Sequence, residues 1–184
     1  LERINLQNQR LKRLVEELLA ISKLESGNEI LKFKRYDIRE TFSIVEATFQ
    51  PMSTFRKIAL QILTPEEPVF VKGDARALEV AINSLVDNAF KFTPEGGRVR
   101  IQLSKQESTA RIEVEDTGCG ISAEHQERVF ERFYRIDAAR TRDRGGSGLG
   151  LAIVKHMAIA HGGEVKLASE LERGSRFTIT LPLA

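Results

Sequence analysis

A length of 184 residues is typical of one domain with a small appendage. Lysine and arginine total 28 against 26 acidic residues, and the net charge of +2 excludes a nucleic-acid binder that works through bulk charge. A hydrophobic share of 41% excludes a disordered chain, and the single cysteine excludes a disulfide framework and indicates a reducing compartment. No apolar run reaches the roughly 18 residues of a membrane span. The chain begins at Leu1 without a signal-peptide pattern, so we expect a piece of a longer protein.

Residues 1–27 are predicted to form a helical arm. Two series of apolar residues recur every seven positions and share one helix face: Ile4, Leu11 and Leu18, and Leu14 and Ile21. Ser26-Gly27-Asn28 is a plausible helix stop. The pattern favours a coiled coil or an antiparallel bundle, and a terminal helix packed on its own domain is the alternative.

From residue 30 on, the pattern changes to that of an α/β domain. A short strand is predicted at 31–33, followed by a helix that Asp37 opens with Glu40 three residues on. Pro51 predicts a kink or an end of that helix. Strands are expected at 58–63 and 69–71, and Asp74 is expected to cap a helix that runs to about Phe92.

The sequence of the second half of the chain predicts more strands than helices. Alternation at 99–103 and 112–114 indicates a hairpin, which is followed by a glycine turn and a helix at about 122–133. A charged segment leads to Ser147, a further helix begins at Leu149 and ends at Gly162-Gly163, and two last strands flank Gly174. The predicted fold class is an α/β two-layer sandwich preceded by an α-helical arm.

A polar face is expected on the helix that ends near Phe92. Ser84, Asn88 and Lys91 follow one another at i, i+4 and i+7, so their side chains share one face away from the apolar stripe. An asparagine oxygen is a neutral ligand that suits Mg²⁺, and lysine brings a point charge for a phosphate. A solvated helix face shows the same spacing, and the spacing alone leaves that alternative open.

A glycine turn directly follows the predicted hairpin. It reads Asp116-Thr117-Gly118-Cys119-Gly120-Ile121. Its glycines allow a close approach of the backbone to a ligand, and the Asp116 carboxylate can accept from an exocyclic amine. Residues 118–123 also fit the dinucleotide-binding fingerprint, with Asp137 near the expected distance. We disfavour that interpretation, because Asp137 follows a helical stretch and the preceding strands form a hairpin and no βαβ unit.

A second glycine-rich segment opens the helix that begins near Leu149. It reads Gly145-Gly146-Ser147-Gly148-Leu149-Gly150-Leu151. Successive backbone N–H groups at a helix start bind anions, although Leu151 stands where a Walker loop needs lysine. Five arginines precede it, at Arg132, Arg135, Arg140, Arg142 and Arg144. A basic segment beside a phosphate site is typical of a lid over a nucleotide, and a solvated loop is the alternative.

Five motifs, in chain order, resemble the boxes of sensor histidine kinases. They are the N box at 88–93, the first glycine box at 116–120, the F box at 130–135, the second glycine box at 146–151 and the last glycine box at 174–177. The resemblance covers about residues 30–184 as an ATP-binding catalytic domain, and 130–156 look most like phosphate-responsive sensors. Residues 11–27 resemble the second helix of the dimerisation and histidine-phosphotransfer domain. The resemblance implies the Bergerat fold of the GHKL superfamily, with about five strands and three helices on one face.

The resemblance also implies roles for individual residues. Asn88 would bind the Mg²⁺ that bridges the ATP phosphates, and Lys91 and Arg135 would be the catalytic charges at those phosphates. Asp116 would accept from the adenine amino group, which selects ATP because guanine presents an oxygen there. The other residues implied in nucleotide binding are Ser84, Phe92, Gly118, Gly120, Ile121, Tyr134, Gly146, Ser147, Gly148, Leu149 and Gly150.

Two departures from the family pattern are visible. The N box commonly carries a second asparagine four residues before the metal ligand, where this chain has Ser84, and the adjacent Asn83 is rotated by about 100° around the helix. The phosphoacceptor is also missing, because none of His125, His156 and His161 stands beside an acid and ahead of a proline. We interpret all three as structural or surface residues, so the chain alone is not expected to phosphorylate itself.

The predicted function is that of the catalytic part of a sensor histidine kinase. It would bind Mg-ATP and transfer the γ-phosphoryl group to a histidine on the dimerisation domain, which then feeds a response regulator. The implied partners are the histidine-phosphotransfer helix of the same protein, the receiver domain and a second copy in a homodimer, without nucleic acid or direct membrane contact. The implied location is the cytoplasmic part of a membrane-anchored sensor. The alternatives are an ATP-driven conformational clamp with Glu79 as its base, and an ATP-binding regulatory module without kinase activity.

Overall fold

The computed structural model describes residues 31–136 and 147–184. Three groups of expectations fall outside these residues: the arm predicted for 1–27, most of the expected lid with Asp137, Arg140, Arg142 and Arg144, and the glycines Gly145 and Gly146. These expectations stay predictions.

A five-stranded mixed sheet forms one layer of the described domain. Its strands are β2 (Ala59–Leu63), β4 (Arg98–Gln106), β5 (Thr109–Asp116), β6 (Glu164–Glu170) and β7 (Gly174–Pro182), in the spatial order β2-β4-β5-β7-β6. The β2 and β4 strands are parallel, and the other neighbours are antiparallel. The predicted hairpin at 99–114 and the mixed five-stranded sheet are both confirmed.

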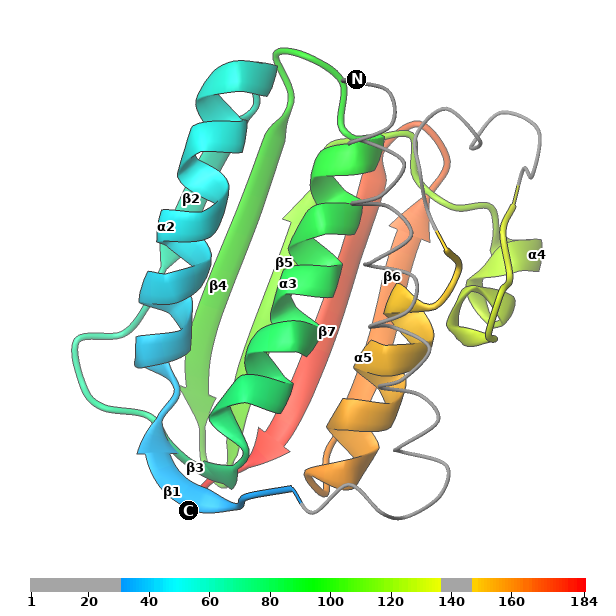
Figure 1. Ribbon diagram of the computed structural model, residues 1–184. Coiled ribbons are helices and arrows are strands. Elements are labelled where there is room, and N and C mark those ends of the chain that lie inside the picture. The colour runs from blue at the N-terminus through cyan, green and yellow to red at the C-terminus, as the bar shows by residue number, and fades with distance from the viewer. Residues whose placement is uncertain (1–30, 137–146) are drawn as a thin grey trace, which may run out of the picture.

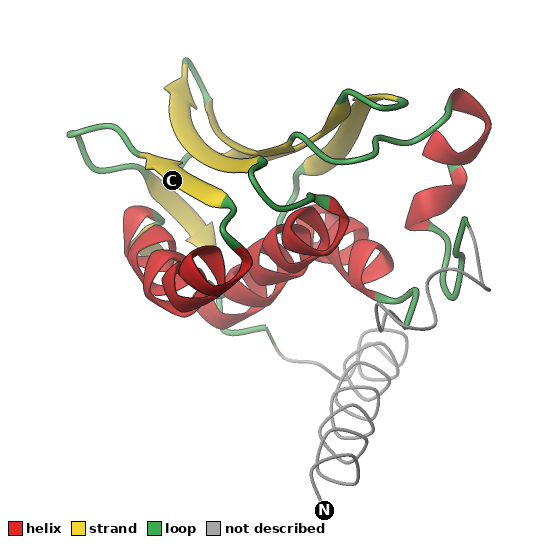
Figure 2. Cartoon of the chain, turned by 90° about the horizontal axis from the view of Figure 1, so that it is seen from above, coloured by secondary structure: helices red, strands yellow, loops and turns green. Residues whose placement is uncertain are grey.

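The second layer consists of three long helices on one face of the sheet (Figures 1 and 2). Within the described residues these are α2 (Arg39–Arg56), α3 (Ala75–Phe92) and α5 (Gly150–Ala160), with α3 in the middle. A short antiparallel ribbon of β1 (Lys34–Asp37) and β3 (Phe70–Gly73) lies at the bottom of Figure 1, next to the C-terminus. No helix in 31–136 or 147–184 combines the length and the apolar character needed to cross a bilayer.

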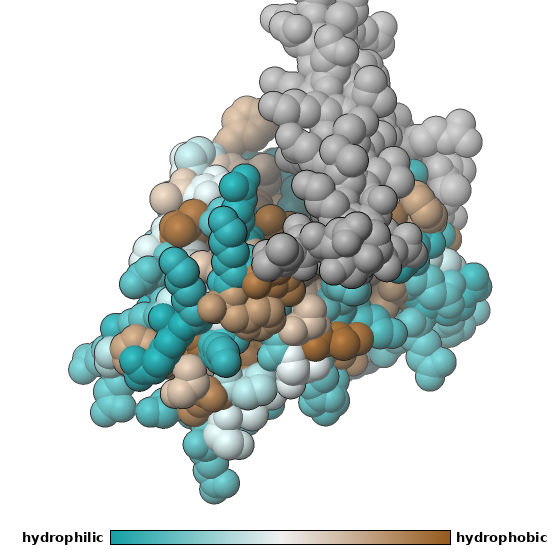
Figure 3. All heavy atoms as spheres, turned by 60° about the horizontal axis from the view of Figure 1, so that its bottom comes forward, coloured by the Kyte–Doolittle hydropathy of each residue, from teal (hydrophilic) through white to brown (hydrophobic). Residues whose placement is uncertain are grey.

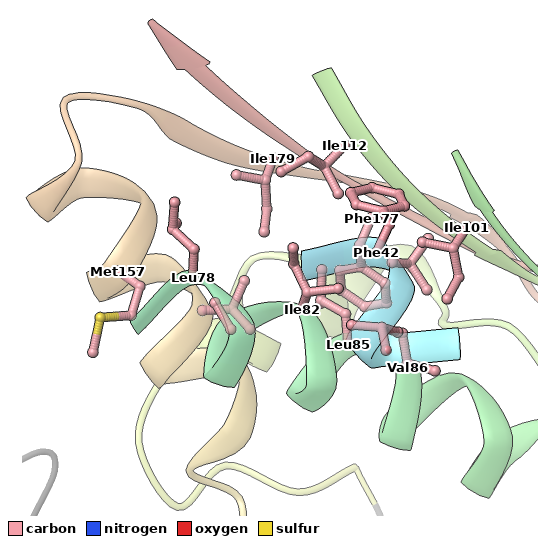
Figure 4. Packing of buried hydrophobic residues seen from close by; sticks show 14 of the residues in the cluster. Phe42, Leu78, Ile82, Leu85, Val86, Ile101, Ile112, Met157, Phe177 and Ile179 are labelled. Carbon is pink, nitrogen blue, oxygen red and sulfur yellow. The ribbon is translucent and has the colours of Figure 1, made fainter. Parts of the chain in front are cut away.

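The core lies between the two layers, where alternate strand residues meet the apolar stripes of the helices. Figure 4 shows helix side chains pointing toward the sheet. The labelled residues come from α2 (Phe42), α3 (Leu78, Ile82, Leu85, Val86), α5 (Met157), β4 (Ile101), β5 (Ile112) and β7 (Phe177, Ile179). Each is buried. Because α3 packs with its apolar stripe inward, its polar face is turned away from the sheet.

The predicted helix at 122–133 is wrong in extent. The chain forms only α4 (Ala123–Gln126) and the 3₁₀ turn η1 (Arg128–Phe130). The Gln126 side-chain amide donates to the carbonyl oxygens of Ile121 and Ser169, which holds α4 against β6. Phe133 then adopts a left-handed φ of 61° and donates its N–H to the Gly148 carbonyl, so the helix cannot continue.

Three expectations near the N-terminus are also decided by the structure: the first strand, the helix start at Asp37 and the effect of Pro51. The first strand occupies 34–37, three residues later than predicted, because it pairs with β3. Asp37 ends this strand, and its carboxylate accepts from the N–H groups of Arg39 and Val69 and from the Arg39 guanidinium, whereas the helix itself begins at Arg39. The α2 helix continues through Pro51 to Arg56, so Pro51 does not end it.

Asp74 caps α3 as predicted. Its Oδ1 accepts from the backbone N–H groups of Arg76 at 3.0 Å and Ala77 at 3.1 Å. Its own N–H donates to Nε2 of His161 at 3.0 Å, just after the end of α5. His161 is 6% exposed, and its Nδ1 lies 2.7 Å from the Met157 carbonyl oxygen. A neutral imidazole protonated at Nδ1 satisfies both contacts, so His161 is a structural residue, as the sequence indicated.

His161 predicts a loss of stability in mild acid. Burial lowers its pKa below 6.5, so the unfolded chain takes up the proton first as the pH falls. The free energy of unfolding should therefore decrease below about pH 6.5, by at most ~1.4 kcal/mol per pH unit. Burial raises the pKa of Asp74, but the hydrogen bonds from the backbone of Lys32, Ala77 and Arg76 together outweigh it and lower the pKa, so Asp74 loses its contribution only in stronger acid. Urea unfolding between about pH 5 and pH 7 measures the slope, which should shrink in His161→Gln and persist in His156→Gln.

Candidate functional site

The polar face of α3 meets the start of α5. A Cβ placed on Gly150 would lie 3.7 Å from the Cβ of Ser84, so the second glycine segment contacts the middle of α3. Asn88 lies one turn further along the same face of α3. The structure thus brings Ser84, one turn before the N box, next to the end of the second glycine box, which lies more than 50 residues later in the sequence.

Lys91 and Phe92 form the end of this face. The Lys91 Nζ lies 2.5 Å from the Asp87 carboxylate, one turn earlier on α3. A contact between Lys91 and a phosphate would compete with this ion pair. Phe92 ends α3 with 36% of its surface exposed, and Thr93 closes the helix by donating from its hydroxyl to the Ala89 carbonyl. Phe92 is therefore accessible to a ligand at the edge of the domain.

Asp116 is a buried carboxylate at the end of a central strand. It is 6% exposed, and its Oδ1 accepts from the Gly118 N–H at 2.8 Å. Burial raises the pKa of this carboxyl, while hydrogen bonds from the backbone of Gly118 and Ser175 act in the opposite direction and the neighbouring Glu115 adds repulsion. A further donor on a ligand would favour the charged form, which suits an exocyclic amine.

The glycines of the first glycine box are needed for contacts within the protein. A Cβ on Gly118 would lie 2.5 Å from the Phe92 carbonyl oxygen, and one on Gly120 would lie 2.0 Å from the Glu170 carbonyl oxygen. Gly120 also has a φ of 66°. These glycines therefore hold the loop against the end of α3 and the β6–β7 turn, and their approach to a nucleotide stays a prediction.

Residues distant in the sequence support Ile121, the last residue of this loop. The Ser169 hydroxyl accepts from the Ile121 N–H at 2.8 Å and lies 3.0 Å from the Ser175 hydroxyl. Gln126 donates to the Ile121 carbonyl at 2.9 Å. Sequence reasoning did not find these supports. The only signal for them was the position of Ser175 next to Gly174 in the last glycine box.

The F box and the second glycine box lie against each other. A Cβ on Gly148 would approach the Phe133 carbonyl carbon to 2.8 Å, and Gly148 has a φ of 76°. Tyr134 follows, with its hydroxyl 2.7 Å from Nδ1 of His125 and the Arg128 guanidinium 4.3 Å above its ring. The two ends of the segment that was expected to form a lid are thus adjacent. His125, interpreted from the sequence as structural, anchors Tyr134.

Arg135 and the backbone at the start of α5 offer hydrogen-bond donors. The Arg135 Nη2 is buried, and no hydrogen-bond partner is found for it among the described residues. The Ser147 hydroxyl accepts from the Leu149 N–H at 3.1 Å, which orders the backbone before α5. The Leu149 side chain is fully buried in the core, so only its backbone can face a ligand. A buried donor without a partner is costly, and an anionic oxygen would satisfy it.

A family model described as "Histidine kinase-, DNA gyrase B-, and HSP90-like ATPase" matches residues 73–184. The chain belongs to this family. The matched region begins next to Asp74 and contains α3, the Asp116 loop, the start of α5 and the last two strands.

Curated relatives narrow the family to sensor histidine kinases. Sensor histidine kinase RppB of Synechocystis is 36% identical over 183 residues, covering 100% of this chain and 40% of its own length. Phosphate regulon sensor protein PhoR of Pseudomonas aeruginosa is 35% identical over 178 residues, covering 97% of this chain and 40% of its own length. The chain thus spans less than half of either relative. It is the ATP-binding catalytic domain of a sensor histidine kinase.

Solved structures agree on the fold. Full-length ShkA in complex with AMPPNP superposes with a TM-score of 0.83 at 29% identity, covering 95% of this chain and 36% of that chain. Histidine kinase ThkA in complex with response regulator protein TrrA gives a TM-score of 0.79 at 25% identity, covering 98% of this chain and 49% of that chain. The predicted histidine kinase fold is confirmed, with its mixed sheet and its helices packed on one face.

The residue types of this kinase domain suit Mg-ATP, with Asn88 on α3 and the Asp116 loop against the end of the same helix. Asn88 offers a neutral oxygen for a hard cation, and the buried Arg135 donor offers a partner for a phosphate oxygen. Asp116 offers a buried acceptor for an amine. Within 31–136 and 147–184 no group of three or more His, Cys, Asp or Glu side chains could hold a metal ion, so a cation here would depend on phosphate oxygens and water as well as Asn88.

Glu79 and Asn83 lie on another side of α3. Glu79 lines a hollow between α2 and α3, together with Glu40 and Arg76. It precedes Asn88 by nine residues, which corresponds to about 13.5 Å along the helix and about 180° around it. Asn83 has a buried Oδ1 without a hydrogen-bond partner among the described residues, and helical geometry places it nearer Glu79 than Asn88 in direction. Ser84, not Asn83, shares the face of Asn88.

Proposed function

We propose that this domain binds Mg-ATP and transfers its γ-phosphoryl group to a histidine of a dimerisation domain. The observation that carries this proposal is the proximity of Ser84 to Gly150, the first residue of α5, because Asn88 lies one turn beyond Ser84 on the same face of α3. A metal ligand and a phosphate-binding helix start are then adjacent. Asp116 adds an acceptor for the adenine base. Its Oδ1 accepts from the Gly118 N–H, and Gly118 lies against the end of α3.

Each residue has a separate task in this proposal. Asn88 holds Mg²⁺, which neutralises charge on the ATP phosphates. Arg135 meets the terminal phosphate, and Lys91 exchanges its Asp87 partner for a phosphate oxygen. Asp116 accepts from the adenine amino group, and Phe92 packs on the base. The backbone N–H groups of 146–148 and 150 bind phosphate oxygens, while the Leu149 N–H donates to the Ser147 hydroxyl.

The transfer needs little covalent chemistry from the domain. An imidazole nitrogen attacks the γ-phosphorus, a P–N bond forms, the bond to the β–γ bridging oxygen breaks, and ADP leaves. The imidazole proton passes to a base that the dimerisation domain supplies. The contribution of this chain is positioning and charge neutralisation at the phosphates.

A response regulator and a second copy of the protein complete the proposed pathway. ThkA has been crystallised with response regulator protein TrrA, and by analogy the phosphohistidine made here would pass its phosphoryl group to a receiver domain. The predicted arm at 1–27 would pair with other bundle helices in a homodimer.

A clamp ATPase is the second candidate function, and the position of Glu79 disfavours it. A general base must lie within hydrogen-bond reach of the water that it activates. Glu79 instead lines the hollow between α2 and α3, on the opposite side of α3 from Asn88.

Incubation with labelled Mg-ATP and a separate bundle protein that carries its acceptor histidine distinguishes the two functions. We expect an acid-labile and alkali-stable phosphohistidine on the bundle protein, formed slowly because the two proteins are not covalently linked. No label should appear on this chain alone. Steady ATP hydrolysis by the chain alone that is lost in Glu79→Ala, with no labelled histidine on the partner, would instead establish the clamp.

A further inference from the structure

The chain enters the domain at a cluster of contacts remote from the proposed nucleotide site. Lys32, the second described residue, donates its backbone N–H to Oδ2 of Asp74 at 2.8 Å. The ring of Phe33 lies 4.9 Å from the ring of His161, centroid to centroid. His161 in turn accepts from the Asp74 N–H. Four residues therefore form one connected unit, which we name the junction cluster: Lys32, Phe33, Asp74 and His161.

The junction cluster joins the entering chain to the ends of two helices. Asp74 is the N-cap of α3, and His161 immediately follows α5. The cluster is tightly packed, since a Cβ on Gly73 would lie 2.6 Å from Cδ2 of His161. The same two helices carry Asn88 near the end of α3 and Gly150 at the start of α5, each at the helix end away from the cluster. Asn88 lies 14 residues beyond Asp74, about 21 Å along α3.

The two oxygens of Asp74 have separate partners. Oδ1 caps α3, whereas Oδ2 holds Lys32. A helix cap needs only one acceptor oxygen, so Oδ2 contributes to the position of the entering chain and not to the helix. Phe33 likewise has no part in the core and is 39% exposed.

Contacts on both sides of the junction cluster also hold this end of the chain, since Leu31 packs against the hydrophobic core and β1 pairs with β3. Figure 3 brings the bottom of Figure 1 forward, and the described residues that are visible there are largely hydrophilic with separate apolar groups between them. Between these two attachments, the junction cluster adds the hydrogen bond of Lys32 to Asp74 and the ring contact of Phe33 with His161.

We propose that the junction cluster positions the catalytic domain relative to the arm at residues 1–27, with Phe33 and Asp74 Oδ2 as the positioning groups. The inference rests on the proposed function, in which the arm belongs to the domain that presents the acceptor histidine. Only residues 28–31 separate the predicted end of the arm from Lys32. An attached Lys32 and Phe33 restrict the directions in which the arm can leave the domain, whereas loss of their contacts leaves only the packing of Leu31 between the arm and β1 and widens those directions.

Four variants separate this positioning role from a structural one. Phe33→Ala removes the ring contact, and Phe33→Tyr restores it. Asp74→Asn keeps an oxygen for the cap, because asparagine is an equally good N-cap, and puts an amide N–H₂ group opposite the Lys32 N–H. Phe55→Ala is the matched control, since Phe55 on α2 is 86% exposed and distant from the cluster in sequence.

The experiment measures the distance between spin labels on the arm and the domain. Labels are attached at Ser22→Cys and Glu107→Cys in a Cys119→Ser background, and labelled chain is diluted with unlabelled chain so that pairs between copies do not contribute. We expect one narrow distance distribution in the parent, Phe33→Tyr and Phe55→Ala proteins. The narrow peak should be lost in Phe33→Ala and Asp74→Asn. Hydrogen exchange of the Lys32 amide should also accelerate about tenfold in those two variants, as for a lost hydrogen bond.

A parent distribution as broad as that of Phe33→Ala would overturn the inference, as would equal broadening in Phe55→Ala. Thermal unfolding checks that each variant is folded, and Asp74→Asn provides a second test if Phe33→Ala is not. Binding of an ATP analogue, measured on the same proteins, should be unchanged throughout. If none of these proteins binds the analogue, the proposed function is contradicted. If they bind it normally but the spin-label distances do not change in the variants, only the positioning role is contradicted.

Discussion

Replacing Asp116 with asparagine should weaken ATP binding at least tenfold and should remove the preference for ATP over GTP. The parent carboxylate accepts from the adenine amino group, and guanine presents a carbonyl oxygen at the same edge. A charge-assisted hydrogen bond is worth ~1.5–3 kcal/mol, which corresponds to about 10-fold to 100-fold in affinity. Asparagine places an N–H₂ group where an oxygen had accepted. Affinity for GTP should therefore rise while affinity for ATP falls.

Glu115→Gln is the matched control for this substitution. Glu115 is the preceding residue on β5, points to the other face of the strand and forms ion pairs with Arg100 and Arg176. Its loss should leave both nucleotide affinities unchanged. Asparagine at 116 still offers an oxygen to the Gly118 N–H, so the loop keeps its internal hydrogen bond. Calorimetric titration with Mg-ATP and Mg-GTP measures the effect, and equal affinity of the parent protein for both nucleotides would refute the role of Asp116.

Local signals made the main elements predictable. Asp74 has the side chain that an N-cap requires, and the helix after it follows a clear apolar period up to Phe92. The alternation in β4 and β5 likewise specifies which residues enter the core. In each case the deciding interaction lies within the element or between chain neighbours. The strand pairing and the cap then follow from the residues themselves.

Long-range contacts decided the elements that were predicted wrongly. Residues 122–133 have apolar positions compatible with a helix, yet the Gln126 amide is held by Ser169 and the Phe133 N–H by Gly148. Neither partner can be inferred from the local sequence. Asp37 resembled a helix cap, but its oxygens are taken by Val69 as well as Arg39. Local propensity was overridden by tertiary structure at both places.

The candidate site also combines features that the local sequence predicts with features that only long-range contacts decide. Helical periodicity predicted that Ser84, Asn88 and Lys91 share a face, and this is confirmed by their positions on α3. The glycines marked positions of unusual backbone, but the partner of Gly120 is the Glu170 carbonyl in a distant turn. The Asp87–Lys91 ion pair and the support of Ile121 by Ser169 became visible only in three dimensions.

Replacing Asn88 with alanine should remove most of the gain in ATP affinity that Mg²⁺ provides. In the proposal Asn88 is the protein ligand of the cation, whereas the adenine and the phosphates have contacts of their own. Metal-free ATP should therefore bind to Asn88→Ala almost as well as to the parent. Loss of outer residues around a metal commonly costs 10-fold to 100-fold, so removal of a direct ligand should slow transfer to a histidine-bearing bundle protein by about 100-fold or more.

Asn83→Ala is the matched control, because Asn83 lies on the same helix but about 100° from Ser84 and about 140° from Asn88 around the helix axis. Its Oδ1 has no hydrogen-bond partner among the described residues, so the substitution removes an amide without breaking a pair found in the structure. Calorimetric titration with ATP in the presence of Mg²⁺ or a chelator should show a metal-dependent loss in Asn88→Ala and none in Asn83→Ala. If the affinities for Mg-ATP and metal-free ATP fall equally in Asn88→Ala, Asn88 is a structural residue. A metal-dependent loss in Asn83→Ala would instead assign the cation to the side of α3 that faces Glu79.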